Sequence, residues 1–183
     1  MNVKACRVDI ARLAYVLEPV MIPTLHRRAL LQGAVAFAAL AARPAFAEAP
    51  ILTVSGAVAD GASRSFTLAD LEAQPRIAFT TKTPWHAGPT AFEGIGIDRF
   101  LDLVGAKGTK LRLIALNDYM AEIEIADIKG LGGILAYRED GNVMPISDKG
   151  PLFVVFPFDS DERLQQQSVY ARCVWQLTTI EIF

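Results

Sequence analysis

The sequence predicts a single α+β domain with mixed sheets, on the strength of three observations. Several short runs alternate apolar and polar residues, which is the pattern of half-buried strands. Residues 97–104 instead place apolar side chains at helical spacing, and Gly105 follows as a C-cap. Glycine and proline interrupt the chain between these segments, and the sequence contains no internal repeat.

The elements ahead of that helix are expected to be two strands and a short helix. Residues 51–58 alternate weakly and predict the first strand. Thr67 is a good N-cap with Asp70 at the third helical position, so a short helix follows it. Residues 76–81 alternate again and predict a strand. Residues 82–96 lack a regular period and carry prolines and glycines, which predicts a structured loop.

The elements after the helix are expected to be mostly strands. Apolar or alternating runs predict strands at 111–116, 120–125, 134–138 and 152–156. Residues 126–130 favour a short helical turn, and 159–167 favour a loop or a short helix. Residues 169–183 predict a long strand or a bent pair of strands, which would place Cys173 on a strand.

The N-terminal region has the features of an export signal at 21–47. A basic stretch at 26–28 precedes an apolar run at 29–42, and a small-x-small pattern at 45–47 predicts cleavage before Glu48. The apolar run is shorter than the about 20 residues that span a bilayer. An uncleaved membrane anchor is therefore the second interpretation.

Two further alternatives concern this signal. Met21 is a candidate true start of the chain. Arg27 and Arg28, followed by Ala29 and two leucines, resemble a twin-arginine signal, and an ordinary secretory signal is the alternative. In either case we expect 1–47 to be a cleaved export signal. Residues 48–183 would then form a minimal single domain, periplasmic or secreted, with no membrane span.

The composition of residues 48–183 argues against several function classes. Twelve lysines and arginines stand against 18 aspartates and glutamates, a net charge of −6, and no basic run occurs. Nucleic acid and anionic membrane are therefore not expected as partners. His86 is the only histidine there, which excludes a multi-histidine zinc site. Cys173 is the only cysteine and cannot form an internal disulfide.

Four segments together resemble the molybdopterin-binding oxidoreductase domain of the sulfite-oxidase family. They are FTLADL at 66–71, FEGI at 92–95 before the helix, NDYMAEI at 117–123, and the stretch from ILA at 134 to KGPL at 149–152. They occur in the family's order over nearly all of 48–183. The resemblance implies a mixed-sheet α+β fold of the sulfite-oxidase type, in a short form.

The resemblance also implies a metal ligand that the sequence does not supply. The family holds molybdenum through two pterin sulfurs and one protein cysteine, because a thiolate is a soft, strongly donating ligand. The matching position lies near Lys82 and Thr83, and neither carries sulfur. Cys173 is either a small buried apolar residue or an unusual ligand that folds back to the pocket. We therefore expect no metal and no cofactor, with molybdopterin as the alternative.

A ligand pocket is expected around Lys82, Trp85, His86, Asn117, Asp118 and Tyr119. The resemblance implies that Tyr119 lines the substrate pocket, where its phenol is the one candidate catalytic group, for hydrogen bonding an oxyanion or relaying a proton. A tyrosine at a strand edge is the alternative. Trp85 and His86 lie on an irregular loop, where ligand contact competes with a core-filling role. Asn117 and Asp118 fit a pocket rim or a turn.

These observations favour an exported, non-catalytic accessory module over an enzyme. Its partner would be a small anionic or pterin-like ligand, or a periplasmic sensor or redox protein. A molybdopterin-dependent oxidoreductase with atypical metal ligation is the alternative, so the sequence leaves enzymatic activity open. Lys82, Arg138, Lys149 and Arg172 are the cations considered for a pterin phosphate.

Overall fold

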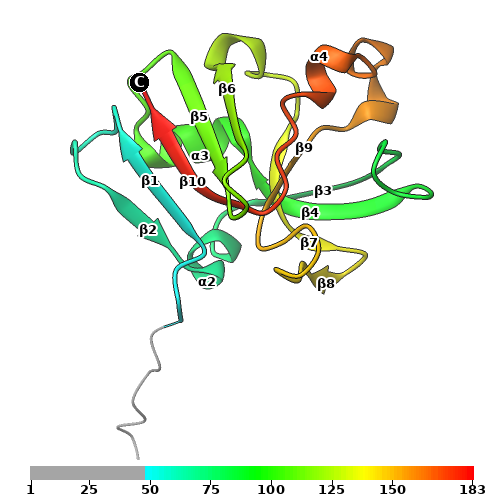
Figure 1. Cartoon of the computed structure of the whole chain (residues 1–183), viewed down its shortest axis with the longest axis horizontal. Helices are drawn as coiled ribbons and strands as arrows, with labels where there is room; N and C mark the ends of the chain where they lie inside the picture. Colours follow the sequence, from blue (N-terminus) through cyan, green and yellow to red (C-terminus); the bar gives the residue numbers. More distant parts are fainter. Residues whose placement is uncertain (1–47) are drawn as a thin grey trace, which may run out of the picture. The chain divides into compact units, whose positions relative to one another are not determined.

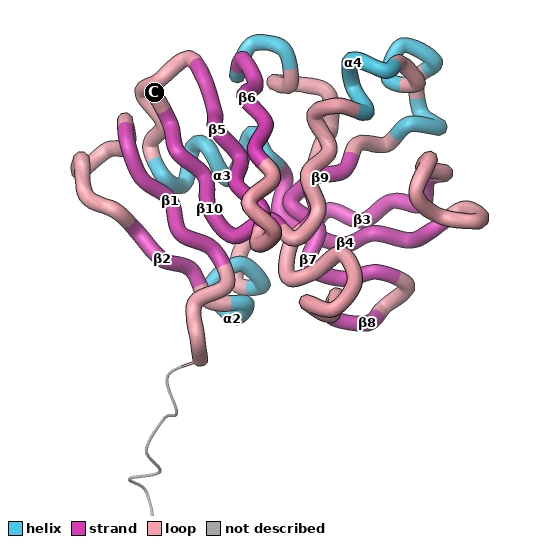
Figure 2. The backbone as a smooth tube through the Cα atoms, viewed as in Figure 1, coloured by secondary structure: helices cyan, strands magenta, loops and turns pink. Residues whose placement is uncertain are grey.

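The computed structural model describes residues 48–183, which fold around two five-stranded sheets (Figures 1 and 2). The first sheet has the strand order β2 (Arg64–Phe66), β1 (Leu52–Gly56), β10 (Leu177–Ile182), β5 (Lys110–Ala115) and β6 (Met120–Glu124). The second has β3 (Arg76–Thr81), β4 (Thr90–Gly96), β7 (Ile134–Glu139) and β8 (Asn142–Val143), while β9 (Phe153–Val155) also pairs with β7. Strands β1 and β10 run parallel, and the other described pairs are antiparallel. The predicted mixture of strands and few helices is confirmed.

The helices of the described region are short. They are α2 (Leu68–Glu72), α3 (Ile97–Val104) and α4 (Gln167–Tyr170), with single 3₁₀ turns η1 (Ile125–Asp127), η2 (Phe158–Ser160) and η3 (Glu162–Leu164). The predicted cap of α2 is confirmed, because the Thr67 hydroxyl accepts the Asp70 N–H while the Asp70 carboxylate accepts the Thr67 N–H. Helix α3 has the predicted bounds, and Gly105 ends it in the left-handed conformation at φ 61°.

Helix α3 lies between the two sheets. Its buried side chains are Ile97, Phe100, Leu101 and Val104. Three of them line one small interior gap together with Leu111 and Ile180 of the first sheet and Leu135 of the second. Both sheets therefore bury their apolar faces against the same helix and share one hydrophobic core. This arrangement fixes the strand ends and loops that carry the pocket.

The prediction of a loop throughout 82–96 is wrong for its second half. Strand β4 occupies Thr90–Gly96 and pairs with both β3 and β7. The glycines of β4 concealed the alternating pattern in the sequence. One of them nevertheless makes the pairing with β7 possible. A Cβ on Gly94 would lie 2.1 Å from the carbonyl oxygen of Leu135 in β7, so only glycine allows this close strand approach.

The prediction of a strand throughout 169–183 is also wrong in part. Helix α4 ends at Tyr170, a turn follows, and only β10 (Leu177–Ile182) is a strand. Cys173 therefore lies in an irregular segment and not on a strand. Gln176 has a positive φ of 54°, which breaks the extended path just before β10.

The predictions of an export signal, its cleavage and the Met21 start fall on residues 1–47 and lie outside the described residues. Within 48–183, none of the helices combines the length and apolar character needed to cross a membrane.

The close approach at Gly94 predicts a large stability difference between two glycine substitutions. Gly94→Ala should lower the free energy of unfolding by about 1–3 kcal/mol or more, because the new methyl group meets the backbone of β7. Gly88→Ala is the matched control, since its Cβ would enter open space. It should change the free energy by less than about 1 kcal/mol. Urea unfolding of both variants measures the difference, and equal stabilities would contradict the close approach.

Candidate functional site

The pocket that best suits a ligand is lined almost wholly by aromatic and apolar side chains. Its volume is about 210 Å³, and its lining residues are Trp85, Asn117, Tyr119, Tyr170, Cys173, Val174 and Trp175. They come from three places: the loop between β3 and β4, the turn between β5 and β6, and the segment that runs from the last residue of α4 towards β10. Drug-sized ligands occupy pockets of roughly 300–1,000 Å³, so this one suits a smaller molecule.

Aromatic rings form the inner part of this pocket at steep angles to each other. The Trp85 ring lies 5.6 Å from Trp175 at an interplanar angle of 63°, and 6.1 Å from Tyr170 at 85°. Trp85 also packs edge-on against the buried ring of Phe153, with 5.7 Å between centroids. These contacts fix the ring orientations, so the pocket walls are set by core packing.

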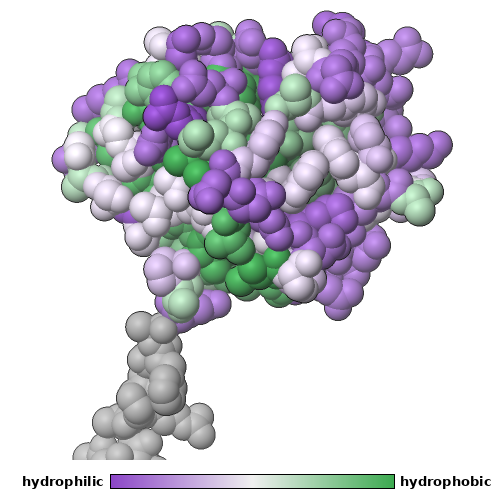
Figure 3. Space-filling model, in the orientation of Figure 1, coloured by the Kyte–Doolittle hydropathy of each residue, from purple (hydrophilic) through white to green (hydrophobic). Residues whose placement is uncertain are grey.

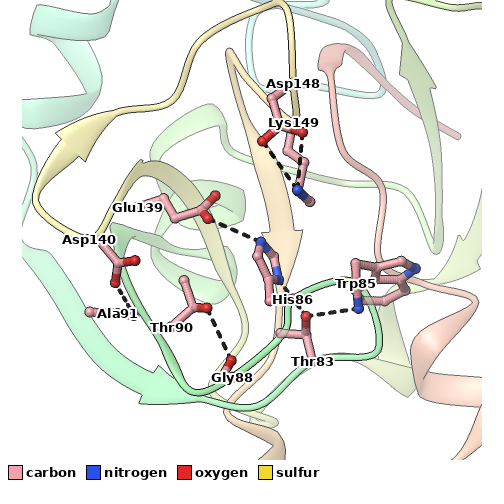
Figure 4. A network of polar contacts seen from close by, with 10 residues as sticks. All are labelled: Thr83, Trp85, His86, Gly88, Thr90, Ala91, Glu139, Asp140, Asp148 and Lys149. Carbon is pink, nitrogen blue, oxygen red and sulfur yellow. Dashed lines mark hydrogen bonds and ion pairs between the residues drawn. The ribbon is translucent and has the colours of Figure 1, made fainter.

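The backbone of Trp85 is held by a buried hydroxyl in its own loop. Thr83 Oγ1 accepts the Trp85 N–H at 3.2 Å and lies 2.5 Å from Nδ1 of His86 (Figure 4). The start of the loop is fixed by a reciprocal pair, in which the Asp159 carboxylate accepts the Lys82 N–H and Thr81 Oγ1 accepts the Asp159 N–H. The loop therefore has little freedom to turn Trp85 away from the pocket.

His86 is part of the core and does not line the pocket. Its side chain is 8% exposed, and its ring packs on Phe92 at 5.4 Å between centroids. Nε2 lies 3.2 Å from Glu139 Oε1 without the geometry of a hydrogen bond. Thr83, His86 and Glu139 thus form a chain of polar contacts that attaches the loop to β7.

The turn between β5 and β6 provides the outer rim of the pocket. Asn117 Oδ1 accepts the Tyr119 N–H at 3.2 Å, and Asp118 adopts a positive φ of 63°, so both residues form the turn. Tyr119 is 52% exposed and still lines the pocket. Its neighbours Leu116 and Met120 are also exposed. Hydrophobic side chains reach the surface near the centre of the face in Figure 3, among hydrophilic ones.

The third wall is held by backbone contacts from distant parts of the chain. The Val174 carbonyl accepts the Val154 N–H of β9 at 2.9 Å. Gln176 donates its side-chain amide to the Ile146 carbonyl at 2.9 Å, and its own carbonyl accepts the Leu116 N–H. One glutamine thereby joins the segment after α4, which carries Trp175, to the turn that carries Tyr119.

Cys173 carries a buried, neutral thiol. Its Sγ donates to the Val169 carbonyl at 3.6 Å, and the residue is 4% exposed. Burial raises the pKa of the Cys173 thiol well above its ordinary value, because the thiolate would lose its hydration. The side chain therefore lines the pocket as a thiol and not as a thiolate.

The structure brings together three of the six residues expected at the pocket: Trp85, Asn117 and Tyr119. Lys82 is exposed and, like Asp118 and His86, lies outside the lining. Sequence reasoning missed Tyr170, Val174 and Trp175. The neighbouring apolar residues Val174 and Trp175 could have indicated a pocket wall. The predicted strand over 169–183 assigned them to a sheet instead.

The lining does not fit a molybdopterin-type cofactor. Such a group needs a thiolate ligand, and the described residues offer only the buried neutral thiol of Cys173. No cationic side chain lines the pocket for a phosphate. Three of the cations considered for that phosphate are already paired: Arg138 with Glu72 at 2.7 Å, Arg172 with Asp127 at 2.7 Å and Lys149 with Asp148 at 3.1 Å. The volume of about 210 Å³ is also small for a pterin that bears a phosphate.

Removal of the Thr83 hydroxyl should loosen the loop that carries Trp85. Thr83→Val keeps the shape but leaves a buried N–H and a buried ring nitrogen without their partner, at an expected cost of about 1–3 kcal/mol. Tryptophan emission should move to longer wavelength as Trp85 gains water contact. Thr53→Val is the control, because the described contacts give that hydroxyl no hydrogen bond. Equal unfolding curves and unchanged emission in both variants would contradict this role.

The buried thiol should react slowly in the folded protein. In a Cys6→Ser background, Cys173 is the only thiol of the chain. A pKa above the ordinary value leaves less thiolate at pH 8, so disulfide reagents should modify folded protein more than about tenfold more slowly than unfolded protein. Absorbance of the released reagent thiol gives both rates. Equal rates would show that Cys173 is accessible and ionised.

Comparisons with known proteins support the fold. No family model and no curated protein matches the chain. Among solved structures, the chain resembles the sulfane dehydrogenase SoxCD from Paracoccus pantotrophus, with a TM-score of 0.56 and 16% sequence identity. The match covers 72% of this chain and 37% of that chain, so this chain corresponds to little more than a third of that subunit. At this identity the likeness shows a shared fold and nothing about activity.

Proposed function

We propose that residues 48–183 form an exported, non-catalytic module that binds a small ligand in the aromatic pocket. The observation that carries this proposal is the pocket's lining, which combines rigid rings with a neutral thiol and no charged side chain. A pocket of this kind offers binding surface but no general base or metal ligand in an ionised state. The sulfite-oxidase-type fold expected from the sequence accommodates such a pocket without the family's chemistry.

Tyr119 has a part in this function as a rim residue. Its phenol is half exposed, and the described residues place no carboxylate, lysine or histidine in the pocket lining to exchange a proton with it. Its ring and hydroxyl are therefore suited to ligand contact at the mouth. A catalytic relay through Tyr119 belongs to the alternative function only.

The alternative is a molybdopterin-dependent oxidoreductase of the sulfite-oxidase type with atypical metal ligation. The observation that favours it is the position of Cys173, which lines the same pocket as Tyr119 and Trp85. The fold likeness to a sulfane dehydrogenase is compatible with it. This alternative requires the Cys173 thiol to lose its proton and leave the Val169 carbonyl.

Metal and pterin content separate the two functions. We expect the protein, expressed in its own host from the full sequence with its signal and purified from the periplasm, to contain only background molybdenum and pterin. Cys173→Ser should leave both values unchanged. Elemental analysis and pterin fluorescence after denaturation give the readout. Near-stoichiometric molybdenum would contradict the binding module, and its loss in Cys173→Ser alone would establish the alternative.

A further inference from the structure

We propose that the aromatic pocket binds a small organic cation whose charge is a quaternary ammonium group, as in choline-like compounds. The inference rests on the proposed function and names the chemical class of its ligand. It replaces the expectation of an anionic or pterin-like ligand, because rings supply the walls of the pocket and no cation lines it.

The ring arrangement suits a compact cation. Trp85 packs at 85° to Tyr170 and at 63° to Trp175, and all three rings line the same pocket in different orientations. Aromatic faces carry negative electrostatic potential, and several of them around one site attract a cation from more than one side. Tyr119 adds a further ring at the open side of the pocket.

The charges of the site point the same way. None of the seven lining residues carries a charged side chain, and burial raises the pKa of the Cys173 thiol so that it is neutral. Residues 48–183 have a net charge of −6, which favours the approach of a cation. An anion would meet the negative faces of the rings without a lysine, arginine or histidine in the lining to balance its charge.

The polar groups of the lining favour a quaternary over a primary ammonium. A primary ammonium has three N–H donors, and each needs an acceptor when it leaves water. Asn117 Oδ1 already accepts the Tyr119 N–H, which leaves the hydroxyls of Tyr119 and Tyr170 as the other side-chain acceptors of the lining, fewer than three N–H donors need. A quaternary ammonium has no N–H group and therefore loses no hydrogen bond on entry. A polar tail on the ligand can remain in water beside the half-exposed Tyr119.

Tryptophan fluorescence of the full chain gives a direct test, because both tryptophans of the protein line this pocket. Choline chloride and tetramethylammonium chloride should change the emission in a saturable manner at constant ionic strength. The neutral probe is 3,3-dimethylbutan-1-ol, in which carbon replaces the charged nitrogen of choline. Sodium phosphate and free pterin are the probes for an anion and for a planar heterocycle.

Variants connect the signal to the rings. Trp175→Leu removes one ring and should weaken cation binding about 2- to 30-fold, the range for one cation–π contact. Tyr119→Leu should weaken it too, and the exposure of Tyr119 protects this variant from folding defects. Phe183→Leu is the matched control, since Phe183 lies against Arg112 and outside the pocket, and its affinity should be unchanged.

The outcomes separate the inference from the proposed function. Saturable binding of the cations, with the neutral alcohol much weaker and both pocket variants impaired, supports the inference. Equal binding of the alcohol, or tighter binding of phosphate or pterin, overturns the cation assignment and leaves the binding module in place. Absence of any cation-dependent change also overturns it. The proposed function is tested by a different measurement, the molybdenum content of the purified protein. Near-stoichiometric molybdenum would contradict it.

Discussion

The pocket depends on one buried polar contact, the pairing of the Thr83 hydroxyl with the Trp85 N–H and the His86 ring. Without it, the loop between β3 and β4 would need water or a ligand to satisfy its polar groups. His86 packs in the core beside Phe92, and the rings of His86 and Trp85 lie to either side of Thr83 in Figure 4. The threonine lies near the position where the sequence resemblance would require a cysteine. At that place this chain has a threonine whose hydroxyl bonds the backbone of the loop that carries Trp85.

The other walls show how the fold assembles a site from distant segments. Gln176 contacts the backbone at Ile146 and Leu116, and Val154 contacts the backbone at Val174. These bonds connect segments that lie far apart in the sequence and hold the pocket walls to each other. The rigidity matters for recognition, because rings already fixed by packing lose little conformational entropy when a ligand enters. The open rim at Tyr119 is the part with the freedom to adapt.

Local patterns in the sequence predicted the elements whose determinants are local. The helix at Ile97–Val104 follows from apolar spacing and Gly105, and the cap of α2 from Thr67 and Asp70. Strand β4 was missed because its strand character depends on the close approach of Gly94 to Leu135, 41 positions along the chain. Val174 and Trp175 of the pocket lining were missed for a similar reason. The path of Cys173–Gln176 is set by long-range backbone bonds, and no local pattern encodes them.

The central claim is that aromatic faces in this pocket recognise a quaternary ammonium. The most direct measurement is by NMR, as intermolecular nuclear Overhauser effects between the methyl protons of tetramethylammonium and the indole protons of the full chain. We expect Overhauser effects from the methyl protons to the indole protons of both Trp85 and Trp175. These effects should disappear when the neutral alcohol replaces the cation. Transfer to neither indole, or equal transfer from the alcohol, would contradict the account.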